Sequence, residues 1–365
     1  MTNQEEKVLR IIRDNPTIEQ SEIAKLLGIK RSTVAVHISN LQKNGYIMGK
    51  GYIVNQEDYV LGIGATNIDI YAKSKIKIRT HYDHPAEIVS AVGGVARNII
   101  SNLSRLDVNC KIITAVGNDS NADVVINDFK NNNIDTSNII TVNGDATGIF
   151  MQVQDENNDM YIAACDMSVL DHISPEYISS RKSIIRNAKL ILVDSSLRDD
   201  TYEELFKICK DDVPIYLDPI SDNYALKMKP YIKNFTCIKP NIKELENLSS
   251  IKINSNDDLS KACKKVLDIG AKKLFVSLGK DGILYMDSNG TTIRRKLKAV
   301  KNMANASGAG DALMAAILYG TVNELSIEKT IDYGLAAGIA SIESEKTIND
   351  DMSIELLDRI IKERK

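Results

Sequence analysis

The first fifty residues place their hydrophobic side chains at the spacing of short amphipathic helices. Apolar stripes over residues 8–12 and 23–27 predict two helices, each followed by a helix-breaking proline or glycine. A third helix is predicted from Ser32 to a C-terminal cap at Gly45. Its inward side is formed by Val34, Ile38 and Leu41. Residues 46–54 place a Gly-Lys-Gly turn between two β-prone runs, which predicts a hairpin.

From residue 59 onward the pattern changes to short β-branched runs that alternate with helical segments. Apolar runs of this kind are typical of strands buried on both faces of a parallel sheet. The predicted strands are Tyr59–Ile63, Lys111–Ala115, Leu190–Val193, Pro214–Leu217, Thr236–Lys239 and Lys273–Ser277. The alternation predicts a three-layer α/β domain with a mostly parallel central sheet.

Two further segments, at about 70–90 and 147–166, interrupt this pattern. Residues 70–79 alternate cations with isoleucine and predict one strand, and residues 147–153 pair across a polar turn with 160–165. We expect antiparallel strands that form a small β lid standing off the main sheet. Its solvent-facing cations are Lys73, Lys75, Lys77 and Arg79.

Length, composition and charge indicate two parts of unequal size. A chain of 365 residues exceeds what one hydrophobic core usually organises, and 43% hydrophobic with 26% charged residues is a globular composition. Residues 1–50 hold eight basic and five acidic side chains, against 38 and 44 in the remainder. We therefore expect a small basic module over residues 1–54 and an acidic body over 59–365.

The sequence carries neither a membrane signal nor a cysteine framework. No stretch approaches the ~20 continuous apolar residues of a membrane span, and the N-terminus has no apolar signal core. We therefore expect a cytoplasmic protein without a membrane partner. The five cysteines are scattered and form no CxxC pair, which predicts reduced, buried side chains rather than disulfides or a zinc site.

Common nucleotide-binding motifs are absent, but another phosphate cradle is present. Residues 62–67 begin like a dinucleotide fingerprint whose third glycine is missing, and no GxxxxGK[ST] occurs. From Asn305 to Asp311 a small, glycine-bearing loop opens directly into an apolar helix. Its backbone N–H groups would stabilise a phosphoryl group at the positive end of that helix.

Asp311 lies where an anion would be bound, and a carboxylate does not help to bind an anion, so this residue needs another role. Its natural use is as a general base that accepts the proton of a hydroxyl attacking the terminal phosphate. The alternative is a first-turn carboxylate that only complements the helix dipole.

The N-terminal segment, with Gln20–Gly28 followed by Ile29–Val34, resembles the winged helix-turn-helix of bacterial regulators. Such a module would offer its third helix to the major groove of DNA and its wing to phosphate. The residues predicted to contact DNA are Lys30, Arg31, Ser32, Thr33, Val36, His37, Asn40 and Lys50. The alternative is a helical module whose solvated surface docks on its own body or on another protein.

Three motifs of the larger part, taken together, resemble the ribokinase-like (PfkB) carbohydrate and nucleoside kinases. They are Gly93–Asn98, Asn241–Glu244 and Gly308–Asp311, and the resemblance covers residues 59–365. It implies an ATP-dependent phosphotransferase that uses Mg²⁺ and an alcohol acceptor. It also implies a β lid that often makes a homodimer.

The resemblance assigns roles to the phosphate-proximal residues. Asp311 matches the catalytic base, which also contacts the substrate, and Gly308, Ala309 and Gly310 match the anion hole. Asn241 and Glu244 match the element that organises Mg²⁺ and its water beside ATP. The alternative for this last pair is a turn followed by a helix start.

The resemblance also assigns the two binding regions. Ser277, Gly279 and Gly282 match the nucleotide-binding turn, although threonine is more usual at the first position; the two glycines are alternatively those of a hairpin. The matched substrate positions are Asn67, Asp69 at the end of the first strand, Gly93, Gly94 and Asn98.

One departure from the family pattern concerns a monovalent cation. The family often has Asp-Thr-Thr before Gly-Ala-Gly-Asp, and that first carboxylate takes part in a potassium site. Here Asn305-Ala306-Ser307 stands instead, which leaves potassium dependence open.

The segments Val92–Leu106, Leu217–Ser221 and Ile342–Asn349 resemble the pseudouridine kinase branch. That branch implies transfer of the ATP γ-phosphate to the 5′-hydroxyl of pseudouridine. The alternatives are another sugar or nucleoside kinase of the same type, or a ligand-sensing transcriptional regulator that uses a kinase fold.

Overall fold

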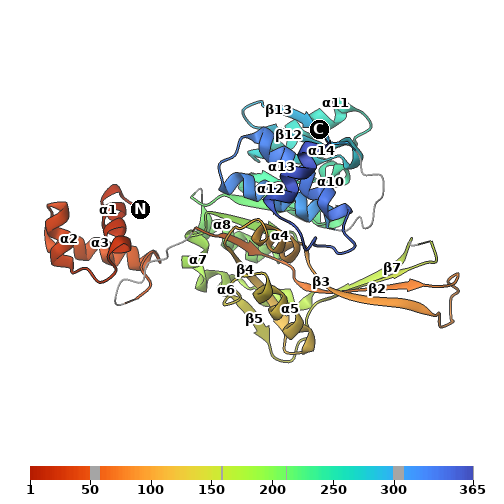
Figure 1. Ribbon diagram of the computed structural model, residues 1–365, viewed down its shortest axis with the longest axis horizontal. Coiled ribbons are helices and arrows are strands. Elements are labelled where there is room, and N and C mark those ends of the chain that lie inside the picture. Colours follow the sequence, from red (N-terminus) through yellow and green to blue (C-terminus); the bar gives the residue numbers. More distant parts are fainter. Residues whose placement is uncertain (50–57, 158, 211, 299–307, 365) are drawn as a thin grey trace.

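The computed structural model describes residues 1–49, 58–157, 159–210, 212–298 and 308–364. A small helical module lies beside a larger α/β body, and a β arm extends from the far side of that body (Figure 1). Within the described residues, no helix combines the length and the apolar character needed to span a bilayer.

The N-terminal module contains the three helices expected, α1 (Asn3–Asp14), α2 (Gln20–Leu27) and α3 (Arg31–Lys43). Its own apolar core includes Val8, Ile23, Val34 and Leu41. The cap of α3 is Asn44, and Gly45 follows it with a φ of 77°. The prediction that Gly45 terminates this helix is therefore right in substance but one residue late. The predicted hairpin lies mostly outside the described residues, and so does Lys50.

The module touches the body through this same helix end. The side-chain amide of Asn187 donates to the carbonyl of Asn44 at 3.2 Å. A Cβ placed on Gly45 would lie 1.6 Å from Ser183 Oγ, so this position is closed to larger residues.

A nine-stranded sheet forms the centre of the body, with the order β13-β12-β11-β10-β9-β8-β1-β4-β5. Its parallel strands confirm all six predicted runs, and β12 and β13 add an antiparallel edge. The strands are β1 (Val60–Ile63), β4 (Cys110–Gly117), β5 (Ile139–Val142), β8 (Leu190–Asp194), β9 (Ile215–Asp218), β10 (Cys237–Ile238), β11 (Lys273–Ser277), β12 (Ile283–Asp287) and β13 (Thr292–Arg295).

Helices cover both faces of this sheet and bury its apolar side chains in two clusters. On one face lie α6 (Pro175–Ser180), α7 (Lys182–Arg186), α8 (Asp199–Cys209), α9 (Asp222–Met228), α10 (Ile242–Ser249) and α11 (Asn256–Ile269). On the other lie α4 (Val95–Ser104), α5 (Ser120–Asn131), α12 (Ala309–Val322) and α13 (Ile327–Ile342), with α14 (Ile354–Arg364) packed outside them. The part of the body that the structure describes also contains 3₁₀ turns at Ser168–His172, Lys229–Asn234 and Gly279–Asp281.

The arm is a separate four-stranded sheet with the order β3-β2-β6-β7. Its strands are β2 (Asn67–Ser74), β3 (Ala86–Gly93), β6 (Ile149–Gln154) and β7 (Met160–Asp166). This confirms the lid but corrects two details. Its first strand covers 67–74 rather than 70–79, and β2 and β6 run parallel.

The cysteine prediction holds for four of the five residues. All five cysteines are free, but Cys165 is exposed on β7 rather than buried. Every residue of this outer lid strand is exposed, so Cys165 faces solvent together with its neighbours.

Candidate active site

The predicted phosphate cradle forms the beginning of α12. Gly308 precedes the helix with a φ of 81°, and a Cβ there would lie 2.3 Å from the carbonyl oxygen of Thr347. Only glycine fits such a position. The first backbone N–H groups of a helix have no partner within it, so the turn at Ala309 and Gly310 suits an anion. Residues 305–307, which depart from the family pattern, lie outside the described residues.

Asp311, in the first turn of α12, is held in an environment that suits a base. Its Oδ2 accepts a hydrogen bond from the side-chain amide of Asn98 at 2.9 Å. Burial, reinforced by the charge of Asp218, raises the pKa of Asp311 to about 7, while Asn98 and Lys239 act in the opposite direction. A carboxylate with a pKa near neutrality is well placed to accept a proton at physiological pH.

The predicted substrate residues gather on the other side of Asp311. Register pairing places Asn67 of β2 opposite Gly93 of β3. Asp69 lies so close to Gly93 that a Cβ there would meet its carboxylate at 2.3 Å. Asp69 therefore belongs to the lid strand β2 and not to the end of the first strand, which corrects the prediction. Asn98 lies on α4, which starts after Gly94.

The Asp69 carboxylate is oriented by its own strand. Its oxygens accept hydrogen bonds from Asn67 Nδ2 at 2.6 Å and from the Tyr71 hydroxyl at 3.2 Å. Burial raises the pKa of Asp69, and these two hydrogen bonds limit the rise. An oriented carboxylate with an adjacent amide is suited to binding hydroxyl groups.

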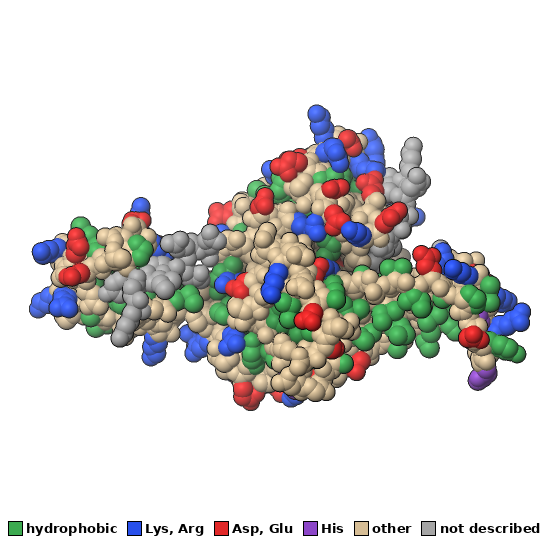
Figure 2. Space-filling view, turned by 60° about the horizontal axis from the view of Figure 1, so that its bottom comes forward, with side chains coloured by type: hydrophobic (Ala, Val, Ile, Leu, Met, Phe, Trp, Pro, Cys, Tyr) green, Lys and Arg blue, Asp and Glu red, His purple; other side chains and the backbone are tan. Residues whose placement is uncertain are grey.

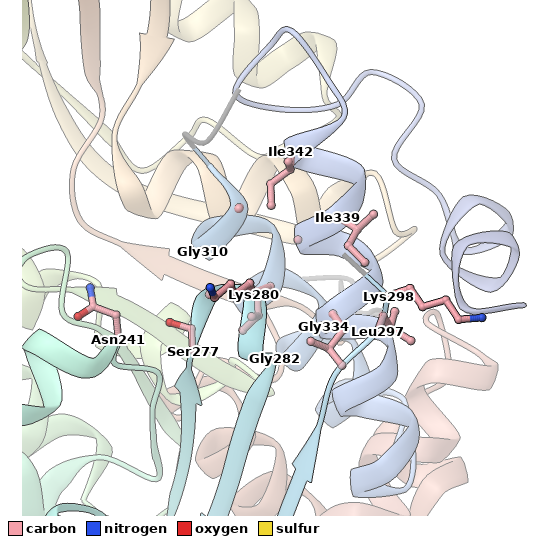
Figure 3. Close-up of a pocket in the computed structure, with 15 residues that line it drawn as sticks. Asn241, Ser277, Lys280, Gly282, Leu297, Lys298, Gly310, Gly334, Ile339 and Ile342 are labelled. Atoms are coloured by element: carbon pink, nitrogen blue, oxygen red, sulfur yellow. The ribbon is translucent and has the colours of Figure 1, made fainter. Parts of the chain in front are cut away.

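A cavity of about 470 Å³ opens on the opposite side of the cradle. It is lined by the predicted residues Asn241, Ser277, Gly279, Gly282, Ala309 and Gly310. Sequence reasoning missed the remaining lining residues: Lys280, Leu297, Lys298, Leu313, Gly334, Leu335, Gly338, Ile339 and Ile342. In Figure 3, Asn241 and Ser277 lie on one side of the cavity, and Leu297, Ile339 and Ile342 on the other. Glycines and aliphatic side chains form a slot that suits a flat, apolar ring.

The Asn241–Glu244 element forms the turn and helix start of the alternative interpretation, and its role toward Mg²⁺ stays a prediction. Asn241 caps α10, and the two residues form a capping box in which Glu244 Oε2 accepts from the Asn241 backbone N–H at 2.9 Å. Asn241 also lines the cavity beside Ser277. Burial, followed by the charge of Asp218, raises the pKa of Glu244 to about 7.

An ion pair that sequence reasoning missed lies between these groups. Lys239 Nζ lies 3.1 Å from Asp218 Oδ2, and both side chains are only 6% exposed. Asp218 is the last residue of β9, and Lys239 directly follows the neighbouring parallel strand β10. The available signal was a charged residue at the end of each of two adjacent apolar runs, because the carboxyl ends of parallel strands meet at one edge of the sheet.

Asp194, at the end of β8, was also missed and has a supporting role. It accepts backbone N–H groups from Ala65 at 2.8 Å and Ala96 at 3.1 Å. A Cβ on Gly64 would meet this carboxylate at 2.4 Å. Asp194 thereby fixes the start of α4, and with it Asn98, relative to the sheet.

The predicted DNA-contacting residues do not all face solvent. The side chains of Lys30, Arg31, Ser32, Thr33, Val36 and Asn40 are exposed. His37 is only 17% exposed and lies 3.9 Å from the Glu5 carboxylate, so its outward placement was wrong. Asn40 also donates to Glu5, at 3.0 Å, because α1 packs against this side of α3.

Comparison with known proteins agrees with this geometry. Residues 57–354 match the model of the pfkB family carbohydrate kinases, and residues 1–48 match a winged helix-turn-helix DNA-binding model. An uncharacterized sugar kinase of Escherichia coli is 28% identical over 97% of this chain and 98% of its own. The pseudouridine kinase of Escherichia coli is 27% identical over 82% and 96%.

Solved structures show the same fold. A candidate sugar kinase from Clostridium perfringens has 31% identity and a TM-score of 0.75, over 85% of this chain and 98% of that one. Arabidopsis thaliana ribokinase complexed with ribose and ATP has a TM-score of 0.74 at 19% identity, over 84% and 99%. The chain therefore belongs to the pfkB family of carbohydrate kinases, phosphotransferases with an alcohol acceptor, and carries an N-terminal winged helix-turn-helix.

Proposed function

We propose that this kinase transfers the γ-phosphate of ATP to the 5′-hydroxyl of pseudouridine, with Asp311 as the general base. The observation that carries the catalytic assignment is the position of Asp311 in the first turn of α12, where its carboxylate accepts a hydrogen bond from Asn98 on the substrate side. The choice of pseudouridine is supported by the resemblance of three segments and by the pseudouridine kinase relatives from Escherichia coli and Arabidopsis thaliana.

The reaction needs one proton transfer and one phosphoryl transfer. Asp311 accepts the hydroxyl proton while the hydroxyl oxygen forms its bond to the γ-phosphorus. The bond between that phosphorus and the bridging oxygen of ADP breaks. Backbone N–H groups at Ala309 and Gly310 stabilise the negative charge on the transferring group.

Asn241 and Glu244 suit the magnesium ion that accompanies ATP. Both present oxygen atoms, the ligands preferred by this cation, and Glu244 shares a buried region with the Asp218 carboxylate. The carboxylates of Asp218, Glu244 and Asp311 surround the ammonium group of Lys239, which pairs with Asp218 Oδ2 at 3.1 Å, so acidic groups outnumber that cation here. Bound Mg²⁺ would supply charge neutralisation of the phosphates, with Asn241 and Glu244 acting through its water.

An ATP-consumption screen tests the substrate assignment. The panel contains pseudouridine, uridine, other nucleosides, ribose and fructose, with Asp311→Asn as the inactive control. We expect the highest kcat/KM for pseudouridine. Activity on hexoses alone would instead favour the second candidate, a sugar kinase of this family, which the sugar kinase relatives support.

We further propose that the N-terminal module binds DNA through the exposed start of α3. The exposed cations Lys30 and Arg31 stand there, where a recognition helix enters the major groove. A mobility shift on the DNA upstream of the coding sequence, at several salt concentrations, tests this. The logarithm of the DNA-binding constant should fall linearly with the logarithm of the salt concentration. Binding that does not change with salt concentration would favour the alternative, in which the module docks on protein. The hydrogen bond between Asn187 of the body and Asn44 of the module supports that alternative. The ATP-consumption screen also tests the remaining alternative, a transcriptional regulator that binds the ligand without phosphorylating it.

The lid supports a homodimer as the working form. Figure 2 shows hydrophobic side chains along the arm. Those most exposed on β3 and β7 include Ile88, Val89, Met160, Tyr161 and Ile162, which are 69, 54, 64, 55 and 59% exposed. Strand pairing through Ala72 and Val153 places Ile88 and Ile162 in one row on the same face of the lid, whereas Val89 lies on the other face. Exposed apolar surface of this kind is characteristic of an interface. Ile88→Lys combined with Ile162→Lys should convert a dimer to a monomer in sedimentation.

A further inference from the structure

Lys239 is a buried cation beside the reaction centre, and the acid–base mechanism does not use it. It follows β10 directly, and its backbone N–H bonds the carbonyl of Leu217 at 3.1 Å. The residue as a whole is 5% exposed. Lysine is rarely buried without a charged partner, so its position needs a physical reason.

The ion pair with Asp218 supplies only part of that reason. An ammonium group has three protons to donate. Among the described residues, Asp218 is the one ionic or hydrogen-bonding contact of Lys239 Nζ. Two protons are therefore left for another acceptor, in a place where water has little access.

The charges around Lys239 explain why bound ATP would need this ammonium group. Burial lowers the pKa of Lys239, but the carboxylates of Asp218, Glu244 and Asp311 together raise it. Three acids thus surround one ammonium group. The phosphates of ATP must approach this same negative region, which is unfavourable unless a cation faces them.

The distance to the cradle is short enough for direct contact with a bound phosphate. A Cβ built on Gly310 would lie 3.4 Å from Lys239 Nζ. Gly310 belongs to the N-terminal turn of α12, so the ammonium group adjoins the peptide that would hold the transferring group. Lys280 also lines the nucleotide cavity but is exposed, so it is hydrated and weaker as an electrostatic partner.

We propose that Lys239 is a catalytic residue that donates a hydrogen bond to a γ-phosphate oxygen of ATP and follows it through transfer. The ammonium group keeps all its protons, because the hydroxyl proton goes to Asp311 and the bond to ADP breaks as the new phosphorus–oxygen bond forms. Asp218 orients Lys239 from the opposite side. The proposal rests on the kinase activity of the family and not on the identity of the acceptor.

The test compares ATP with ADP, because only ATP carries the γ-phosphate. In Lys239→Met, the kcat should fall about 10²–10³-fold, as for loss of one preorganised donor. Affinity for ATP, measured calorimetrically with Mg²⁺, should fall at least ~10-fold more than affinity for ADP. Lys239→Arg should recover part of both. Lys273→Met, at the opposite end of the adjacent strand β11, is the matched control and should leave the ATP-to-ADP ratio unchanged.

A second variant separates catalysis from folding. Lys239→Met leaves Asp218 buried without its partner, which is destabilising. Lys239→Met combined with Asp218→Asn removes both charges and should fold. If Lys239 binds the γ-phosphate, this double variant remains slow and keeps its selective loss of ATP affinity. Recovery of kcat in the double variant, or equal losses for ATP and ADP, would overturn the proposal.

Discussion

Replacement of Asp311 by asparagine should abolish catalysis while making the protein more stable. The side chain keeps its shape and its contact with Asn98, which lies 2.9 Å away, but it loses its charge and its basicity. Removal of a general base costs roughly 10²–10⁴ in rate. The stability change has the opposite sign, because the folded protein holds this carboxylate in a place that disfavours its charge.

The magnitude follows from the pKa of Asp311, which rises from 3.8 to about 7 on folding. A group whose folded pKa is raised adds stability below its unfolded pKa and loses it as pH rises through the folded value. At 1.36 kcal/mol per pKa unit, the charged Asp311 destabilises the fold by at most ~4 kcal/mol at pH 8. Asp218 and Glu244 share the same repulsion, so the gain in Asp311→Asn should be smaller than this limit.

Single-turnover phosphorylation and thermal melting test the two halves of the prediction. At pH 8 the variant should melt several degrees higher than the parent, and this gain should shrink as pH falls from 7 toward 4. Asp119→Asn is the matched control. Asp119 caps α5 and accepts bonds from Thr147 and Ala122 that outweigh burial and lower its pKa. That variant should lose stability and keep its rate.

Two results would refute this reasoning. A rate for Asp311→Asn within tenfold of the parent would exclude the base role. A lower melting temperature at pH 8 would exclude a buried, destabilising carboxylate at this position.

Four further predictions concern other parts of the chain. The value of kcat/KM should rise with pH through about 7, the pKa of Asp311. Asn98→Ala should move this midpoint to higher pH, because the hydrogen bond from Asn98 lowers the pKa of Asp311 and the variant lacks it. Gly308→Ala should cost about 1–3 kcal/mol in urea unfolding, since φ is 81° and the Cβ would lie 2.3 Å from the Thr347 carbonyl; unchanged stability would contradict this. Gly338→Leu places a side chain in the nucleotide cavity and should raise the KM for ATP at least ~10-fold with little change in kcat. Arg31→Ala should reduce the salt slope of DNA binding by about one, whereas an unchanged slope would show that Arg31 contacts no phosphate.

The local elements were predictable because their causes are local. Helices α1 to α3 end at Asn15, Gly28 and the Asn44–Gly45 turn, and the central strands coincide with apolar runs. The predicted start of the lid strand β2 was three residues too late, because Asn67 and Asp69 are polar and look like turn residues. They are instead held by pairing with β3, a contact that no pattern within the segment expresses.

The candidate site divides in the same way. The sequence by itself determined the cradle at Gly308–Asp311, the capping element at Asn241–Glu244 and the helical module before the body, since each depends on residues a few positions apart. Only the tertiary structure decided that Asn98 meets Asp311 across 213 positions, that α13 lines the cavity beside the start of α12, and that Lys239 lies beside Gly310. These contacts arise where parallel strands bring their carboxyl ends to one edge. The same burial that assembles them also sets the pKa of Asp311, which depends on the charges and desolvation around it rather than on its neighbours in the chain.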